Sequence, residues 1–269
     1  MKPHRFSLEP LNFPTMPASD LVSVAAQASF EFVSFTLNTP AAKVLPVSEV
    51  VADRSRRSAL KAQMRETGVG LLNIECFNLT PESKVEEFRA GLECGHDLGA
   101  RSGTAILWEN SNRADGLAKY RALCDMAAEL GISINLEFFG TCKSMNKLGD
   151  ALAFVKEAAR PNGGLVIDIM HVIRNGSSVE DLRKLDPKLI KMVQLCDGPK
   201  SVPPDFAVAE VTANRLYPGE GTFPVRDFVR ALPSDAVVGL ECPKETLSGK
   251  VSPVEQARNM LAAARAVYA

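Results

Sequence analysis

The stretch Gly163-Gly164-Leu165-Val166-Ile167-Asp168-Ile169-Met170-His171 carries the strongest indication of the fold. A short apolar run that follows two glycines is typical of a buried parallel strand, and Asp168 falls where that strand ends. Three other apolar runs also end on a carboxylate or an amide, namely residues 132–136 before Glu137, 190–193 before Gln194 and 237–240 before Glu241. If these strands close into a barrel, the four polar side chains converge at one end of it.

Strand and helix candidates alternate along the whole chain. The strand candidates cover residues 6–8, 30–37, 69–76, 102–108, 132–137, 163–168, 190–194 and 237–241. The helix candidates between them cover residues 19–28, 53–67, 81–98, 113–130, 145–159, 178–185, 227–232 and 252–268. Eight such units in 269 residues predict a (β/α)8 TIM barrel that forms a single domain over residues 1–269. No GxGxxG or GxxxxGK[ST] motif supports an open doubly wound sheet.

The composition narrows the class of partner. Lys and Arg number 31 against 32 Asp and Glu, and no long run of one sign occurs, which argues against nucleic acid and acidic membranes as partners. The first residues lack the apolar segment of a signal peptide, and no stretch approaches the roughly 18 apolar residues of a membrane span. We therefore expect a cytoplasmic protein. Its six cysteines show no CxxC spacing and are expected to be buried apolar groups.

The four strand-end residues form a candidate metal site. Three carboxylates and one amide oxygen make a hard ligand set with a net charge of about −3, which suits Mn²⁺ or Mg²⁺ best, with Co²⁺ or Zn²⁺ as further possibilities. Without a cation the carboxylates would repel one another and raise their own pKa values. Any one of them could instead be a helix N-cap or the partner of a loop arginine. In the first half of the chain only Glu75 and Lys61 come into question as charged site residues.

Two further residues are expected at the same end of the barrel. His171 follows the quoted strand and would contact a substrate or transfer a proton there, unless it makes only a structural loop contact. Arg215 lies in the longest stretch without an expected element, residues 196–224. Glycines at 219 and 221 could let backbone N–H groups approach an oxygen-rich ligand beside Arg215, although a plain turn is the alternative. Asp197 belongs to the same set of loops.

The spaced motifs resemble one superfamily. They are Leu-Glu at 136–137, Asp-Ile-Met-His at 168–171, Gln-Leu-Cys-Asp at 194–197, Arg215 with Pro-Gly-Glu-Gly at 218–221, and Leu-Glu at 240–241. This set resembles the sugar phosphate isomerase/epimerase group of the xylose isomerase-like TIM barrels. The resemblance implies that a divalent metal is held by Glu137, Asp168, Gln194 and Glu241. It further implies an acid/base pair, Glu137 and Glu241, and substrate contacts from His171 and Arg215.

The implied activity is a metal-dependent isomerisation or epimerisation of a small ketose, inositol-like or other polyol-derived carbonyl compound. Gln194 departs from this pattern, because many sugar epimerases of the family have His there. Glutamine at this position resembles the dehydroshikimate dehydratases, which often carry His where this chain has Phe139. A lyase of the dehydroshikimate or inosose type is therefore the second hypothesis, and a non-catalytic binding barrel is the third. The sequence does not decide between a monomer and a homo-oligomer.

Overall fold

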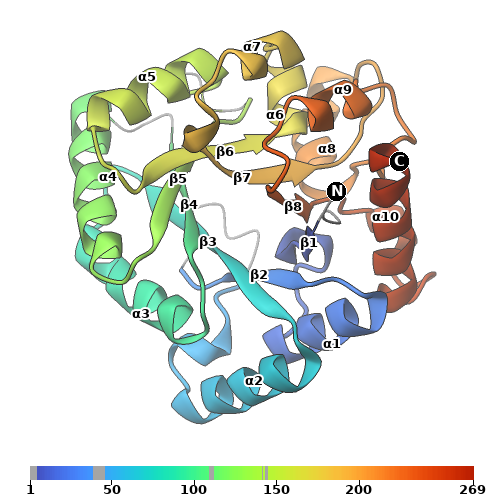
Figure 1. The fold of residues 1–269 in the computed structure, drawn as a ribbon, viewed down its shortest axis with the longest axis horizontal. Helices are drawn as coiled ribbons and strands as arrows, with labels where there is room; N and C mark the ends of the chain where they lie inside the picture. The colour runs from blue at the N-terminus through green and yellow to red at the C-terminus, as the bar shows by residue number, and fades with distance from the viewer. Residues whose placement is uncertain (1–4, 39–45, 109–111, 141, 143–144) are drawn as a thin grey trace.

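A computed structural model describes residues 5–38, 46–108, 112–140, 142 and 145–269. Eight parallel strands close into a barrel, in which each strand pairs with the next and the first pairs with the last (Figure 1). They are β1 (Arg5–Leu8), β2 (Phe32–Thr36), β3 (Gly70–Leu79), β4 (Ser102–Leu107), β5 (Ser133–Glu137), β6 (Gly163–Asp168), β7 (Ile190–Leu195) and β8 (Val237–Leu240). The predicted (β/α)8 barrel is confirmed.

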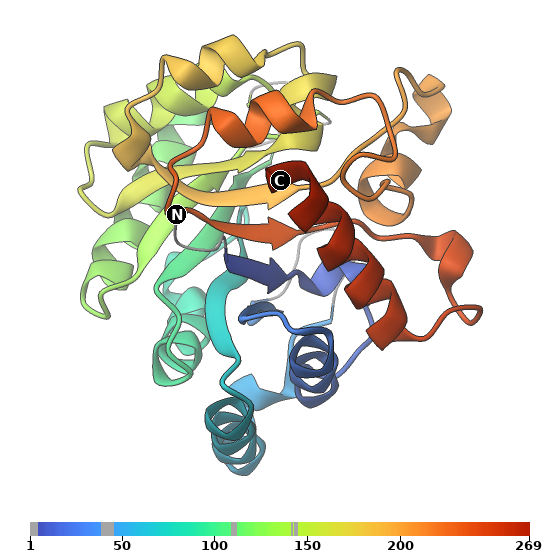
Figure 2. The same cartoon turned by 45° about the vertical axis from the view of Figure 1, so that its right-hand side comes forward.

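Helices surround the barrel, and the first of them, α1, packs against the last, α10 (Figure 2). The α-helices are α1 (Ala18–Ala28), α2 (Arg54–Thr67), α3 (Arg89–Asp97), α4 (Arg113–Ala128), α5 (Leu148–Ala158), α6 (Ile169–Arg174), α7 (Val179–Arg183), α8 (Ala207–Ala213), α9 (Val225–Arg230) and α10 (Pro253–Tyr268). The single helix expected over residues 81–98 is wrong at its start, because a 3₁₀ turn, η3 (Val85–Phe88), precedes α3.

Local capping explains several helix starts. Asp53, Asn112 and Ser252 accept hydrogen bonds from the first-turn N–H groups of α2, α4 and α10. Ser178 forms a capping box with Asp181 at the start of α7. The helix expected from residue 19 begins one residue earlier, at Ala18, and follows Pro17.

The interior of the barrel is unusually polar. Asn73 and Glu75 alternate along β3 and so share one face, and Glu75 lines the barrel mouth, which places Asn73 inside. The Asn73 amide donates to Thr104 Oγ1 at 2.7 Å, and the Asn135 amide donates to Ser102 Oγ at 2.6 Å. Apolar side chains instead fill the layer between the strands and the outer helices.

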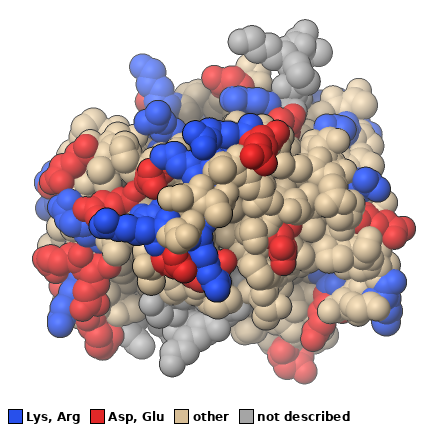
Figure 3. Space-filling model, turned by 90° about the horizontal axis from the view of Figure 1, so that it is seen from below, with Lys and Arg blue, Asp and Glu red and all other residues tan. Residues whose placement is uncertain are grey.

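The surface mixes charges of both signs. Blue and red side chains lie next to one another across the face in Figure 3. Many of these side chains form ion pairs, such as Lys61 with Asp97 at 2.5 Å. Lys61 therefore lies on this surface and not at the barrel mouth. Among the described residues, no helix is long and apolar enough to cross a membrane.

Candidate active site

A cavity of about 600 Å³ opens at the C-terminal ends of the strands. Its ionisable lining residues include Glu75, Glu137, His171, Arg215 and Glu241, most of them predicted site residues. The rest of the wall is largely apolar and includes Leu11, Ile106, Trp108, Phe139, Val202, Val208 and Val211. This is the face of a TIM barrel on which active sites are built.

Asp168 ends β6 and begins α6. Its Oδ1 accepts the Met170 N–H at 2.8 Å, which caps the helix and turns His171 toward the barrel mouth. His171 Nε2 lies 3.8 Å from Glu137 Oε1 and 3.7 Å from Asp168 Oδ2. Ligand atoms of these three residues all lie within 4.8 Å of one another, a spacing that a single metal ion could bridge. His171 thus faces the site, as predicted, although from a helix that was not expected.

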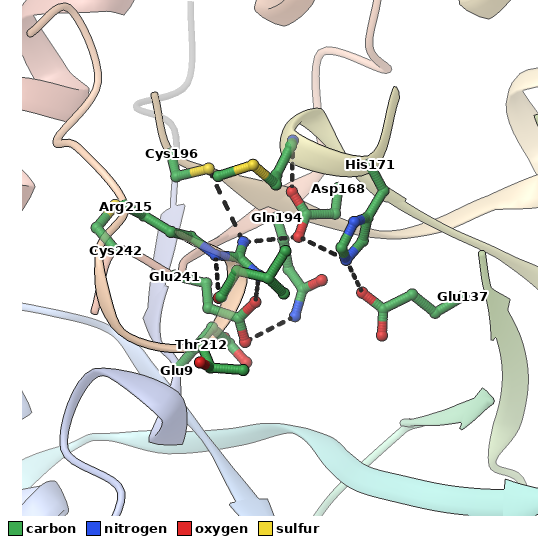
Figure 4. A network of polar contacts seen from close by, with 12 residues as sticks. Glu9, Glu137, Asp168, His171, Gln194, Cys196, Thr212, Arg215, Glu241 and Cys242 are labelled. Carbon is green, nitrogen blue, oxygen red and sulfur yellow. Dashed lines mark hydrogen bonds and ion pairs between the residues drawn. The ribbon is translucent and has the colours of Figure 1, made fainter. Parts of the chain in front are cut away.

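Arg215 is the buried cation of the site. Its Nη1 donates to Asp168 Oδ2 at 2.7 Å, and its Nη2 lies 3.0 Å from Glu241 Oε2 (Figure 4). The side chain is only 2% exposed. One guanidinium therefore joins two of the expected metal ligands, which come from strands β6 and β8. Asp168 is consequently both a helix cap and the partner of an arginine, the two alternatives that the sequence left open.

Gln194 completes the group of strand-end residues. Its Nε2 donates to Glu241 Oε1 at 3.3 Å, while its buried Oε1 has no hydrogen-bond partner among the described residues. A buried acceptor without a donor costs free energy, so this oxygen is suited to a cation or an ordered donor. Gln194 thus contacts Glu241, which Arg215 joins to Asp168, and metal binding by the four strand-end residues remains a prediction.

Burial changes the protonation of these groups. Desolvation raises the pKa of Glu137 well above its usual range, and the charges of Glu241 and Glu75 raise it further. Desolvation also raises the pKa of Glu241 to about 7, although the Arg215 charge opposes the shift. The pKa of His171 falls to about 4 because its ring is buried, so its imidazole is neutral at pH 7. The acidic groups therefore attract either protons or a cation.

Glu9 is a buried carboxylate that sequence reasoning missed. It directly follows β1 at the same end of the barrel, and neither of its oxygens has a donor in hydrogen-bonding geometry among the described residues. Desolvation and the nearby Glu75 charge raise its pKa well above the usual value. The signal was its place after a strand, as for Glu241, but the first strand is only four residues long and carries no motif.

Glu75, which the sequence supported only weakly, also lies in the cavity lining. Its Oε1 accepts hydrogen bonds from the Asn73 amide at 2.5 Å and from the Thr104 hydroxyl at 3.2 Å. Desolvation, reinforced by the Glu241 charge, raises the pKa of Glu75 to about 8. The mouth of the barrel thus contains more buried carboxylates than the motif set alone indicated.

The glycine loop has a different role from the one expected. The N–H groups of Gly198, Gly219 and Phe223 donate to the Asp197 carboxylate at 2.7–3.0 Å. The expectation that Gly219 offers its N–H to a ligand is therefore wrong. Asp197 also exchanges two backbone hydrogen bonds with Leu216, so the loop fixes the chain next to Arg215.

An aromatic wall stands on the β4–β5 side of the cavity. The rings of Trp108 and Phe139 meet edge to face at 5.3 Å, and Phe139 lies 6.0 Å from the His171 ring. Trp108 Nε1 donates to Asn78 Oδ1 at 2.7 Å, which holds the indole in place. Such a wall suits the carbon face of a ring-shaped or extended polyol.

Comparison with known proteins identifies the family that the chain resembles. A family model described as xylose isomerase-like TIM barrel matches residues 22–266. An inosose isomerase of Bacillus licheniformis is 30% identical over 145 residues, which are 51% of this chain and 51% of that protein. The chain therefore matches about half the length of this curated relative.

Two solved structures share the fold over nearly the full chain. An IolI protein with a bound zinc atom aligns with a TM-score of 0.78 and 18% identity, covering 98% of this chain and 96% of the other. A probable 3-DHS dehydratase, AsbF of Bacillus anthracis, aligns with a TM-score of 0.75 and 14% identity, covering 96% and 97%. At these identities the likeness concerns the barrel alone.

Proposed function

The chain belongs to the xylose isomerase-like TIM barrel family, and we propose that it is a divalent-metal-dependent isomerase or epimerase of a small polyol-derived ketone. The observation that carries this proposal is the placement of Glu137 and Glu241. They project into one cavity from β5 and from the end of β8, with Asp168, Gln194 and Arg215 between them. The name of the Bacillus licheniformis relative makes inososes the first substrates to test.

The two glutamates are suited to move a proton. One carboxylate would remove the proton from the carbon beside the carbonyl, and the other would return a proton to the same or the neighbouring carbon. Without a metal the pKa of Glu241 is raised to about 7, and a bound divalent ion would lower it, so the ionised carboxylate could accept a proton near neutral pH. The neutral His171, between Glu137 and Asp168, would hold a substrate oxygen by a hydrogen bond.

The residues fit a divalent ion. Glu137, Asp168, Gln194 and Glu241 would hold it, and the unpartnered Gln194 Oε1 supports this assignment because a metal would satisfy that buried oxygen. Their oxygen-only chemistry favours Mn²⁺ or Mg²⁺, with Zn²⁺ or Co²⁺ as alternatives. A bound ion would supply a Lewis acid that stabilises the negative charge on the carbonyl oxygen as the proton leaves.

The cavity favours an uncharged substrate over a phosphorylated one. Both arginines in its described lining already pair with carboxylates, Arg215 with Asp168 and Glu241, and Arg174 with Glu210 at 2.5 Å. The Trp108 and Phe139 rings offer an apolar face for a carbon ring. We infer a neutral ketone with several hydroxyl groups.

The test follows candidate ketoses, inososes and 3-dehydroshikimate in D₂O with Mn²⁺ by mass spectrometry. Deuterium gain at the carbon beside the carbonyl, without loss of water, is the expected result. Replacing Glu241 with Gln should abolish this exchange by at least about 10³-fold, because the variant loses a proton-transfer group. Exchange that persists at the wild-type rate in a folded E241Q variant would contradict the mechanism.

A dehydratase is the second candidate because Gln194 stands where many epimerases carry His. Elimination would begin with the same proton removal and would then expel a hydroxyl group as water. Loss of water from 3-dehydroshikimate or an inosose in the same experiment would assign the chain to this lyase class instead.

A further inference from the structure

We propose that Arg215 is a built-in counter-cation that competes with the divalent metal for its ligands, so that removing its charge tightens metal binding. The inference rests on the metal site of the proposed function. It concerns how the site is balanced when no ion is bound. The observation behind it is that one guanidinium contacts two of the four expected ligands.

Both oxygens of Asp168 already have partners. Oδ1 accepts the Met170 N–H at 2.8 Å, and Oδ2 accepts Arg215 Nη1 at 2.7 Å. A carboxylate oxygen can accept a second interaction, but a cation placed there must approach the positive guanidinium. Metal binding at Asp168 therefore opposes an ion pair that is only 2% exposed on the arginine side and fully buried on the aspartate side.

Glu241 is engaged in the same way. Its Oε2 lies 3.0 Å from Arg215 Nη2, and its Oε1 accepts the Gln194 amide at 3.3 Å. Glu137 and Gln194 Oε1 are the ligand groups that Arg215 does not contact. The site is thus divided into a side compensated by the guanidinium and a side that remains available to a cation.

The scaffold holds Arg215 independently of the two carboxylates. Its Nε donates to the Val211 carbonyl at 2.8 Å, and its backbone N–H donates to the Pro243 carbonyl at 3.0 Å. The next residue, Leu216, is fixed by its backbone pairing with Asp197. The guanidinium therefore cannot move far when an ion enters, and its charge persists in the metal-bound state.

The electrostatic consequence has a definite sign. When its three carboxylates are ionised to receive a cation, the site has a net charge of about −2 with the guanidinium, against about −3 without it. A divalent ion a few ångströms away is repelled by the fixed positive charge, and this repulsion is weakly screened because the groups are buried. Arg215 thus stabilises the buried carboxylates in the absence of a metal, and it weakens the binding of a divalent ion.

The experiment measures Mn²⁺ binding alone, without substrate, by isothermal titration calorimetry and by the Mn²⁺-induced rise in melting temperature. In Arg215→Met the affinity should increase by at least about tenfold, because a neutral side chain removes the repulsion. Arg215→Lys keeps the positive charge and should bind Mn²⁺ with an affinity within about twofold of the wild type. Arg215→Gln is neutral but can still donate a hydrogen bond to one carboxylate, so it should bind Mn²⁺ more tightly than the wild type, as Arg215→Met does. Arg160→Met removes an arginine that pairs with Asp125 on the surface, away from the four ligands, and should change Mn²⁺ affinity by less than about twofold.

The outcomes separate this inference from the proposed function. Mn²⁺ binding to the wild type with equal or weaker binding to the two neutral variants, Arg215→Met and Arg215→Gln, would overturn the competition but leave the metal site in place. Absence of Mn²⁺ binding from wild type and variants alike would overturn both. If Arg215→Met unfolds because two carboxylates lose their partner, Arg215→Gln decides: tighter binding than wild type supports the competition, and equal or weaker binding overturns it.

Discussion

Buried carboxylates have different partners on the two sides of the barrel mouth. On the β6–β8 side, Asp168 and Glu241 share the Arg215 guanidinium. On the β1–β3 side, Glu75 receives hydrogen bonds only from uncharged donors, and Glu9 has none in hydrogen-bonding geometry among the described residues. The comparison teaches that the same fold position and residue type can be neutralised by a fixed cation on one side and by a proton on the other.

On the β6–β8 side, where Arg215 neutralises the carboxylates, the loss of one charge should lower the free energy of unfolding more than on the other side. Replacing Asp168 with Asn preserves the helix cap but removes one anionic partner of a buried arginine. We expect the free energy of unfolding to fall by about 3 kcal/mol, at the low end for a broken buried pair because Glu241 still contacts the guanidinium. Urea unfolding of the metal-free protein at pH 7 measures this change.

The control for Asp168→Asn is an exposed ion pair. Asp125 pairs with Arg160 at 2.6 Å on the surface, and Asp125→Asn should cost less than about 1 kcal/mol. A loss of stability in Asp168→Asn no larger than in this control would mean that the buried pair contributes nothing net.

On the β1–β3 side, where a proton neutralises the buried carboxylates, the free energy of unfolding should depend on pH. The folded pKa of Glu75 is about 8, above its usual value of 4.5, so the folded state holds a proton that the unfolded state releases between these values. This group therefore stabilises the fold below about pH 4.5 and loses that contribution as pH rises toward 8. Glu75→Gln should remove a slope of about 1 kcal/mol per pH unit between pH 5.5 and 7.5, measured by urea unfolding with EDTA.

A matched variant checks that this slope belongs to Glu75. The pKa of Asp97 is lowered from 3.8, chiefly by its hydrogen bond from Lys61. Asp97 is therefore ionised in both states across this pH window. Asp97→Asn should change stability by the same amount at pH 5.5 and 7.5. An unchanged slope in Glu75→Gln would show that Glu75 is ionised in the fold.

Much of this site could be predicted from the sequence because parallel strands in a barrel end at one edge. Glu137, Gln194 and Glu241 each follow or end an apolar run. The alternation of strand and helix candidates was therefore enough to predict that these side chains lie at one end of the barrel. Asp168 shows a limit of such reasoning, since cap and arginine partner were alternatives in the sequence and both hold in the structure. Its pairing with Arg215 joins residues 47 positions apart, and no local pattern encodes it.

Short elements account for the features that the sequence did not predict. The helices α6 and α8 have six and seven residues, too few to show a clear helical period. Because α8 lies inside the stretch expected to be irregular, its Val208 and Val211 were not assigned to the cavity wall. Glu9 was missed because a four-residue strand gives little alternation to extend, although its position after that strand matches Glu241.

A substitution of Glu9 tests whether a proton neutralises the carboxylates on the β1–β3 side, and its expected effect on the free energy of unfolding is the smallest of those predicted. Burial raises the pKa of Glu9 and so favours its protonated form, and Glu9→Gln then replaces one neutral group by another of similar shape. The space beside it is limited, since a Cβ on Gly239 would lie 2.7 Å from Glu9 Oε1. We expect a change of no more than about 1 kcal/mol in the free energy of unfolding at pH 7. A loss of 3 kcal/mol or more would mean that Glu9 is ionised and held by a cation, and the two sides of the mouth would then follow the same rule.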